Sequence, residues 1–443
     1  MDNKKIRVAI THGDTNGIGY ELIFKAFEDP EMFDLCTPII YGSPKVAAYH
    51  CNALGIDGNA FSIINSADEA EDGRINLLPA FDEEVKVDLG APSQDASRAA
   101  IKSIDRAITD YKDGLFDVLV TGPVDKNNMH VDGFDFPCNE RFIASCIGDG
   151  KKAIDILIND TLRVAFATDD IALKDVPAAI TKETIVDKVA LFYATLRRDF
   201  QIESPRIAVL ALNPNDTDAH PGKEEQEAIV PAIQQLSDAG VCVFGPYQAE
   251  AFFADSDFTA FDGILAMYHD QGAAPLKAIN PDDNIHYLGG LPLVSASPDT
   301  TPRYDIAGKG QADASAFRHA IYQAIDGFRA RLAFDEPYAN PLPKLYREKK
   351  DESEKVRFTI PKKHENAIRE RQKPFPAKSS ETAAKPAGAN AAKPTENNAA
   401  KPTENNAAKP SVVENKPAEP AANTAETTTT KPATAEQSST EQA

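Results

Sequence analysis

A histidine, an aspartate and a lysine stand close together in the stretch AMYHDQGAAPLK, residues 266 to 277. His269 and Asp270 come at the end of a short apolar run that is typical of a buried strand, and Lys277 follows seven residues after Asp270. An imidazole beside a carboxylate can hold a metal ion or move a proton. We therefore interpret this stretch as part of a metal or acid–base site whose other members lie elsewhere in the chain.

Glycine-rich or polar turns also follow three other apolar runs. The turn HGDTNGIG (12–19) could bring backbone N–H groups to an anion, although a tight turn explains its glycines equally well. The turn TGPVDK (121–126) ends in Lys126, and LNPNDTDAH (212–220) ends in a histidine. Any one of these could be an ordinary loop, but their joint order and spacing are more specific than any single one.

The elements that must position these loops are alternating strands and helices. The expected strands are short, apolar and rich in β-branched residues, as in strands covered on both faces. They are 6–11, 37–42, 116–122, 162–168, 206–214 and 262–269. Helical patterns are expected at 97–111, 181–196 and 223–240, with Thr181 as a helix start. This rhythm predicts an α/β protein with a largely parallel sheet, in which ligands gather at the carboxyl ends of strands.

Composition limits the class of protein. No stretch reaches the roughly 18 apolar residues that a membrane span requires, so we expect no membrane segment and no signal peptide. The net charge of −21 argues against binding to nucleic acid or to an anionic membrane surface. The five cysteines lack CxxC spacing and are odd in number, so we expect free thiols in a reducing, cytoplasmic compartment.

The chain divides into three regions by composition. Residues 1–340 contain the apolar runs, and 341–375 form a linker dense in charge. Residues 376–443 have no aromatic side chain and contain KPTENNAA twice in tandem, so we expect a disordered tail that acts as a solvated spacer.

The motif order identifies a family. THGDTNGIG, LVTGPVDK, LNP, AMYHDQG, PLK, GLP, SPD and AGKG resemble 4-hydroxythreonine-4-phosphate dehydrogenase, the PdxA family of vitamin B6 biosynthesis, from near residue 5 to about 335. The resemblance implies an isocitrate/isopropylmalate dehydrogenase-like fold, with two α/β domains around a cleft, in a homodimer. It also implies oxidation of a small phosphorylated hydroxy acid with NAD or NADP, followed by loss of carbon dioxide.

The metal site of the family is altered here. The family holds a divalent metal with three histidines, and the metal ion polarises the reacting oxygen. His269 matches the third of them, whereas Asp170 and Asn215 stand at the first and second positions. By resemblance the metal residues are therefore His269, Asp170 and Asn215, a set that suits Mg²⁺ or Mn²⁺ better than Zn²⁺. Three further residues of the same loop could add ligands, although a solvated acidic loop is the commoner meaning: Asp216, Asp218 and His220.

Substrate and cofactor positions are altered as well. By resemblance, Cys138 and Asn139 stand in the family's Gly-His-Thr-Glu substrate loop, and Lys277 is a further substrate residue. His286 stands where the family has an asparagine, with Asn284 close to it. Ser295 stands where the family has an arginine that binds phosphate. The cofactor loop, His-Gly-Thr-Ala in the family, gives Thr300, Thr301 and Arg303, with Gly308 in the intact AGKG. The proposed catalytic residues are Lys277 and Asp270.

Three hypotheses follow from this pattern of kept and lost residues. The first is an enzyme of the family's reaction type, on the same or a different hydroxy acid. The second is a catalytically silent paralogue that binds a metabolite or a protein partner. The third is a tethering protein whose tail is the functional part. Cofactor binding separates the first two, and a phenotype on deletion of the tail alone would favour the third.

Overall fold

The structure is a computed structural model that describes residues 5–339, apart from 58–59, 82–83, 130–135, 137 and 215–221. The expected linker and tail lie outside these residues, and so does Asn215. None of the helices in the described ranges is both long and apolar enough to cross a lipid bilayer.

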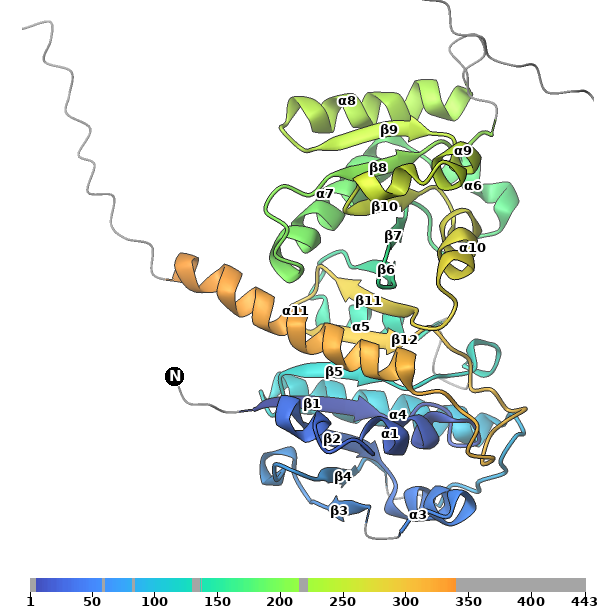
Figure 1. Cartoon of the computed structure of the whole chain (residues 1–443), viewed down its shortest axis with the longest axis vertical. Coiled ribbons are helices and arrows are strands. Elements are labelled where there is room, and N and C mark those ends of the chain that lie inside the picture. The colour runs from blue at the N-terminus through green and yellow to red at the C-terminus, as the bar shows by residue number, and fades with distance from the viewer. Residues whose placement is uncertain are drawn as a thin grey trace, which may run out of the picture. The chain divides into compact units, whose positions relative to one another are not determined.

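A twelve-stranded sheet runs through the described region in the order β3-β4-β2-β1-β5-β12-β11-β6-β7-β10-β8-β9 (Figure 1). The strands are β1 (Ile6–Thr11), β2 (Cys36–Gly42), β3 (Phe61–Ile63), β4 (Ile75–Pro79), β5 (Val118–Thr121), β6 (Ile154–Ile158), β7 (Arg163–Phe166), β8 (Ile207–Leu210), β9 (Val243–Tyr247), β10 (Gly263–Ala266), β11 (Ile285–Gly289) and β12 (Val294–Pro298). Every strand expected from the sequence is present, and the apolar runs of β2, β5, β8 and β10 are buried at every residue.

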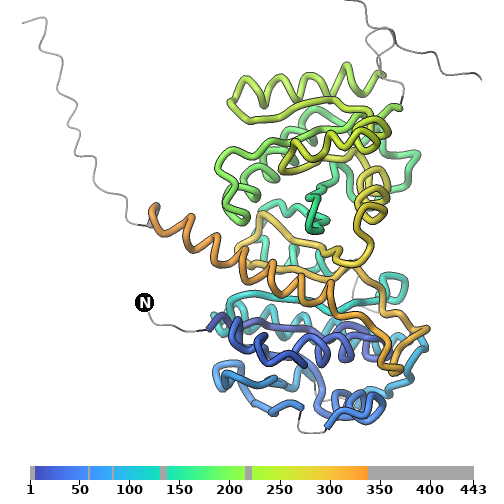
Figure 2. Tube along the Cα trace, in the orientation of Figure 1, coloured from blue at the N-terminus to red at the C-terminus, as the bar shows by residue number. Residues whose placement is uncertain are grey.

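The sheet is largely parallel, as expected, but its middle is not. β11 pairs antiparallel with both β12 and β6, and β6 pairs antiparallel with β7. The parallel set around β1 and the parallel set around β10 therefore run in opposite directions. The chain trace places the N-terminal strands in one half and β7 to β10 in the other, with β11 and β12 between them (Figure 2).

Eleven α-helices of the described residues connect or flank the strands. They are α1 (Gly19–Ala26), α2 (Met32–Leu35), α3 (Pro44–Leu54), α4 (Gln94–Lys112), α5 (Asn139–Ile147), α6 (Val176–Ala179), α7 (Lys182–Asp199), α8 (Val230–Asp238), α9 (Ala249–Ala254), α10 (His269–Ile279) and α11 (Ser315–Ala339). The expected helix start is confirmed, because the Thr181 hydroxyl accepts a hydrogen bond from the Thr184 N–H at 3.1 Å. A π-helical turn at Glu225–Ile229 leads into α8, so the helix expected at 223–240 has two parts.

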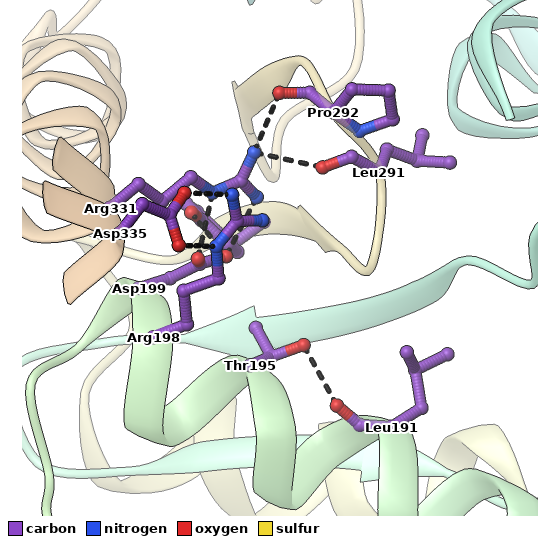
Figure 3. A network of polar contacts seen from close by, with 9 residues as sticks. Leu191, Thr195, Arg198, Asp199, Leu291, Pro292, Arg331 and Asp335 are labelled. Carbon is purple, nitrogen blue, oxygen red and sulfur yellow. Dashed lines mark hydrogen bonds and ion pairs between the residues drawn. The ribbon is translucent and has the colours of Figure 1, made fainter. Parts of the chain in front are cut away.

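One buried ion pair joins α7 and α11 beneath β11 (Figure 3). The Arg331 guanidinium donates to both oxygens of Asp199 at 2.7 Å. It also donates to the carbonyl oxygens of Leu291 and Pro292 at 2.8 and 2.9 Å. The Tyr287 hydroxyl donates to Asp199 at 2.9 Å. We call Arg331, Asp199 and Tyr287 the buried network.

Candidate functional site

The loops after β5, β10 and β12 line one cavity of about 920 Å³. Its wall includes Lys126, His269, Lys277, Asp299 and the start of α5. A second cavity of about 1010 Å³ adjoins it, and the two share Lys126, Glu140, His269 and His286. His269 and Lys277 of the stretch AMYHDQGAAPLK therefore line the same cavity as residues from distant loops.

Four charged side chains form a continuous cluster at the shared wall. His286 Nδ1 lies 2.9 Å from Asp155 Oδ2, and its Nε2 lies 3.4 Å from Asp299 Oδ1. The ammonium of Lys277 lies 2.6 Å from the other oxygen of Asp299. We call Asp155, His286, Asp299 and Lys277 the cleft cluster.

Sheet register explains why these residues meet. Asp155 on β6 lies opposite Leu288 on β11, so His286, two residues away, is its diagonal neighbour on the same face. Asp299 directly follows β12, whose last residue Pro298 pairs with Ile285. Lys277 comes from α10, two turns after His269.

The cluster keeps its members charged. Burial alone would lower the pKa of His286, but Asp155 and Asp299 on its two sides raise that pKa well above the usual value. Burial alone would raise the pKa of Asp299, but His286 and Lys277 hold it well below its usual value. The pKa of Asp155 is also lowered, because His286 and Lys126 together outweigh its burial. The cleft cluster therefore contains two carboxylates, an imidazolium and an ammonium.

Lys126 lines both cavities beside the cleft cluster but is not a member of it. Its ammonium makes no hydrogen bond or ion pair with any residue in the described ranges. Burial opposes its charge, yet Glu140, Asp170 and Asp155 raise its pKa above the ordinary value. Glu140 accepts a hydrogen bond from Ser297 at 3.2 Å, so its carboxylate is fixed near this ammonium.

The expected metal residues do not form a three-donor site in the described part of the chain. His269 Nδ1 lies 2.9 Å from Asp270 Oδ1, and both side chains are exposed, at 46% and 87%. Asp170 is exposed and lines only the larger cavity, while Asp270 lines neither. Asn215, with Asp216, Asp218 and His220, lies outside the described residues. Among those that are described, no group of three histidines, cysteines or carboxylates could hold a metal. Of the three expected metal residues only His269 and Asp170 are described, and these two do not by themselves make up a metal site.

The expected substrate residues divide into two groups. Cys138 directly precedes α5 without a capping side-chain hydrogen bond, and burial together with Glu140 raises its thiol pKa to about 12, so the thiol is neutral. Asn139 is 3% exposed and lines the 920 Å³ cavity, and its Oδ1 has no hydrogen-bond partner among the described residues. Lys277 and His286 belong to the cleft cluster. Ser295, in contrast, is buried within β12 and lines neither cavity.

The expected cofactor loop packs against the glycine-rich turn. Thr300, Thr301 and Arg303 line the 920 Å³ cavity, and Arg303 pairs with Asp305 at 2.9 Å. The Ile18 N–H donates to the Pro302 carbonyl at 3.0 Å, and a Cβ on Gly17 would lie 2.7 Å from that same oxygen. The backbone N–H groups of four residues in this turn already donate to protein oxygens, which favours a tight turn over an anion site; the four are Asp14, Asn16, Gly17 and Ile18. Gly308, with φ of +72°, lines neither cavity and packs on Leu89.

Sequence reasoning did not single out Asp155, Asp299 or Glu140 as site residues. A signal for Asp155 existed, because it is a lone carboxylate within the apolar run AIDILI (153–158). That run was not among the expected strands, so its face could not be assigned. The five cysteines are free, as expected from their number and spacing.

Comparison with known proteins gives consistent matches. The family profile described as pyridoxal phosphate biosynthetic protein PdxA matches residues 34–324. A 4-hydroxythreonine-4-phosphate dehydrogenase from Bacteroides thetaiotaomicron is 48% identical over 359 residues, which cover 81% of this chain and 98% of that protein. One from Aquifex aeolicus is 34% identical and covers 72% of this chain and 97% of its own.

Solved structures of the same name have the same fold. The crystal structure of 4-hydroxythreonine-4-phosphate dehydrogenase from Klebsiella pneumoniae matches with a TM-score of 0.64 at 26% identity, covering 74% of this chain and 99% of that one. The enzyme from Burkholderia phymatum matches with a TM-score of 0.60 at 29% identity, covering 73% and 99%. The expectation of an α/β fold shared with these dehydrogenases is confirmed.

Proposed function

The chain belongs to the PdxA family, and we propose that it binds a small hydroxy acid in the cavity lined by the loops after β5, β10 and β12 and oxidises its secondary alcohol with NAD or NADP. The relatives that it matches over nearly their full length are named as dehydrogenases of 4-hydroxythreonine 4-phosphate. The observation that carries the proposal is the common lining of one cavity by Lys126, His269 and Lys277, which come from separate loops and elements.

Each proposed role uses a contact of this chain. Lys126, charged and without an ion-pair partner in the described ranges, attracts the carboxylate of the ligand. Asn139 offers a buried acceptor to a hydroxyl or amino group. Lys277, held by Asp299, remains the proposed proton-handling residue, and Asp270, which lines neither cavity, acts through its contact with His269.

The cofactor would be held at the loop that contains Thr300, Thr301 and Arg303, whose side chains border the same cavity. When bound, the nicotinamide accepts a hydride from the alcohol carbon. Since the described donor set does not fit a metal, no part of this proposal depends on one.

A silent paralogue that binds a metabolite or partner is the second candidate. Two observations favour it, namely the absence of a three-donor metal group among the described residues and the pairing of Arg303 with Asp305 in the cofactor loop. Under this reading the cleft binds its ligand without turnover.

The test is an assay of NADH and NADPH formation with phosphorylated and unphosphorylated hydroxy acids, combined with melting curves at high ligand concentration. A ligand that binds only the folded state raises the melting temperature by mass action, so weak sites are detectable. We expect cofactor to raise the melting temperature, with little or no oxidation of 4-phosphohydroxy-L-threonine. Absence of both cofactor binding and turnover on every acid would contradict the dehydrogenase proposal and favour the second candidate.

Two further parts of the proposal concern assembly and location. We propose a homodimer, as the family resemblance implies, and sedimentation at micromolar concentration would contradict it if only a monomer is found. We propose a cytoplasmic location because all five cysteines are free thiols, three of them buried.

A further inference from the structure

Asp14, in the glycine-rich turn, joins two loops that line the 920 Å³ cavity. The hydroxyl of Tyr304, in the cofactor loop at 300–305, donates to Asp14 Oδ2 at 2.8 Å. The Asp14 N–H donates at 2.8 Å to the carbonyl oxygen of Pro123, in the loop that carries Lys126. Tyr304, Pro123 and Lys126 line the cavity, whereas Asp14 is 1% exposed and does not. One buried residue therefore connects the loop of Lys126 to the cofactor loop.

The buried carboxylate of Asp14 depends on its hydrogen-bond donors. Besides the Tyr304 hydroxyl, the Asn16 N–H donates to Asp14 Oδ1 at 2.8 Å. Burial raises the pKa of Asp14, and these two hydrogen bonds oppose the rise. Because a buried carboxylate that loses a donor is costly, Asp14 holds the Tyr304 hydroxyl in place.

The cofactor loop has a strained backbone between two such ties. Arg303 has a φ of +45°, in the left-handed region that residues other than glycine rarely adopt. Pro302, just before it, accepts a hydrogen bond from the Ile18 N–H at 3.0 Å, and Tyr304 follows it. Strained backbone persists where its surroundings fix it, and such positions cluster at ligand-binding loops. The hydrogen bond between Asp14 and Tyr304 therefore helps to fix the shape of the loop.

We propose that Asp14 and Tyr304 are positioning residues, which hold the cofactor loop and the loop of Lys126 in their binding geometry before the cofactor arrives. The inference rests on the proposed function for the identity of the cofactor loop. A loop that is ordered in advance loses less conformational entropy on binding, so its ligand binds more tightly. Asp14 acts only through Tyr304 and the backbone, since it does not line the cavity.

Removal of one hydroxyl tests the inference. Tyr304→Phe deletes the donor to Asp14 and keeps the aromatic ring. In titrations of the full chain with NADH and with NADPH at neutral pH, we expect the variant to bind about tenfold more weakly whichever cofactor wild type binds. Hydrogen exchange of the segment 300–306, measured without cofactor, should be faster in the variant than in wild type.

Three further variants separate positioning from a general loss of stability. Tyr322→Phe is the matched control, because its hydroxyl contacts the Met32 sulfur at 3.2 Å and the residue lines neither cavity. Its cofactor affinity should equal that of wild type. Asp14→Asn keeps an amide that can donate to the Tyr304 hydroxyl, so it should bind cofactor more tightly than Asp14→Ala, which keeps no partner for it. If Asp14→Ala does not fold, Tyr304→Phe still decides.

Two kinds of failure can be told apart. Equal cofactor affinity of wild type and Tyr304→Phe would overturn this inference alone, and so would equal hydrogen exchange of the segment 300–306. If wild type binds neither NADH nor NADPH, the cofactor part of the proposed function fails and the positioning role fails with it.

Discussion

Neighbouring residues on β11 carry two ion networks that differ in exposure. Tyr287 belongs to the buried network, where the side chains of Arg331 and Asp199 are 6% and 2% exposed. The Arg331 guanidinium makes four hydrogen bonds there (Figure 3). His286 belongs to the cleft cluster, where Lys277 and Asp155 are 44% and 36% exposed and border cavities. Because side chains alternate across a strand, one strand supports both networks on opposite faces.

The difference separates stability from binding. The buried network holds α7 and α11 together beneath the sheet and is closed to ligands. The cleft cluster includes groups that a ligand can approach, and its charges balance within the protein. The same pairing of carboxylate and cation is therefore expected to decide folding on one face and ligand binding on the other.

Breaking the buried network should have the largest effect. Arg331→Met keeps the apolar stem but leaves Asp199 buried without its cation, and we expect a loss of about 3 to 5 kcal/mol in the free energy of unfolding. Urea unfolding measures it. A loss below about 1 kcal/mol would mean that the network does not carry the stability that its burial implies.

Alkaline pH should separate the two faces. The pKa of His286 is raised in the folded protein, so its ion pairs contribute fully below the unfolded value of 6.5 and are lost as pH rises through the folded pKa. The stability difference between wild type and His286→Asn should therefore shrink on alkalinisation, from at most about 1.5 to 3 kcal/mol. The matching difference for Tyr287→Phe should stay constant up to about pH 9, because the tyrosine of the unfolded chain ionises near its ordinary pKa of about 10, while the pKa of Tyr287 in the folded protein is raised well above that value. A constant difference for His286→Asn would contradict the assignment of an imidazolium.

The exposed pair beside the buried network should matter much less. Arg198 and Asp335 join the same two helices at 39% and 49% exposure. Asp335→Asn should cost about 0.2 to 1 kcal/mol in urea unfolding, because solvent screens the pair and its side chains lose entropy on pairing. A cost equal to that of Arg331→Met would remove burial as the explanation for the first prediction.

Removal of the tail should have the smallest effect. Residues 376–443 have no aromatic side chain, and both networks lie before residue 340. Truncation after residue 375 should leave the melting temperature unchanged within error. A decrease of several degrees would show that the tail docks on the region that contains the two networks.

Local signals in the sequence predicted much of the frame. The run IRVAIT became β1 with the same bounds, and Thr181 caps α7 as its hydroxyl and position suggested. The order of the loop motifs also identified the family, because each motif is a short, continuous segment that can be recognised without the structure. Strands without a long apolar run, such as β11 and β12, were missed, since their residues are buried by neighbours that are distant in the chain.

The site was predicted only in part, for a related reason. Lys277, His286, Cys138 and Asn139 are at the cavity wall, while Ser295 and Gly308 are not, and Asn215 lies outside the described residues. Matching a position to a motif assigns a residue type and leaves open whether its side chain reaches the cavity.

The sequence by itself determined the family, the order of the elements and the presence of isolated charges such as Asp155 within an apolar run. Only the tertiary structure decided how those charges pair. Asp155 and His286 are 131 residues apart, and they meet because β6 and β11 are antiparallel neighbours in one register. A shift of one residue would turn His286 to the face of Tyr287 and exchange the ligand cleft for the buried network, since side chains alternate along a strand.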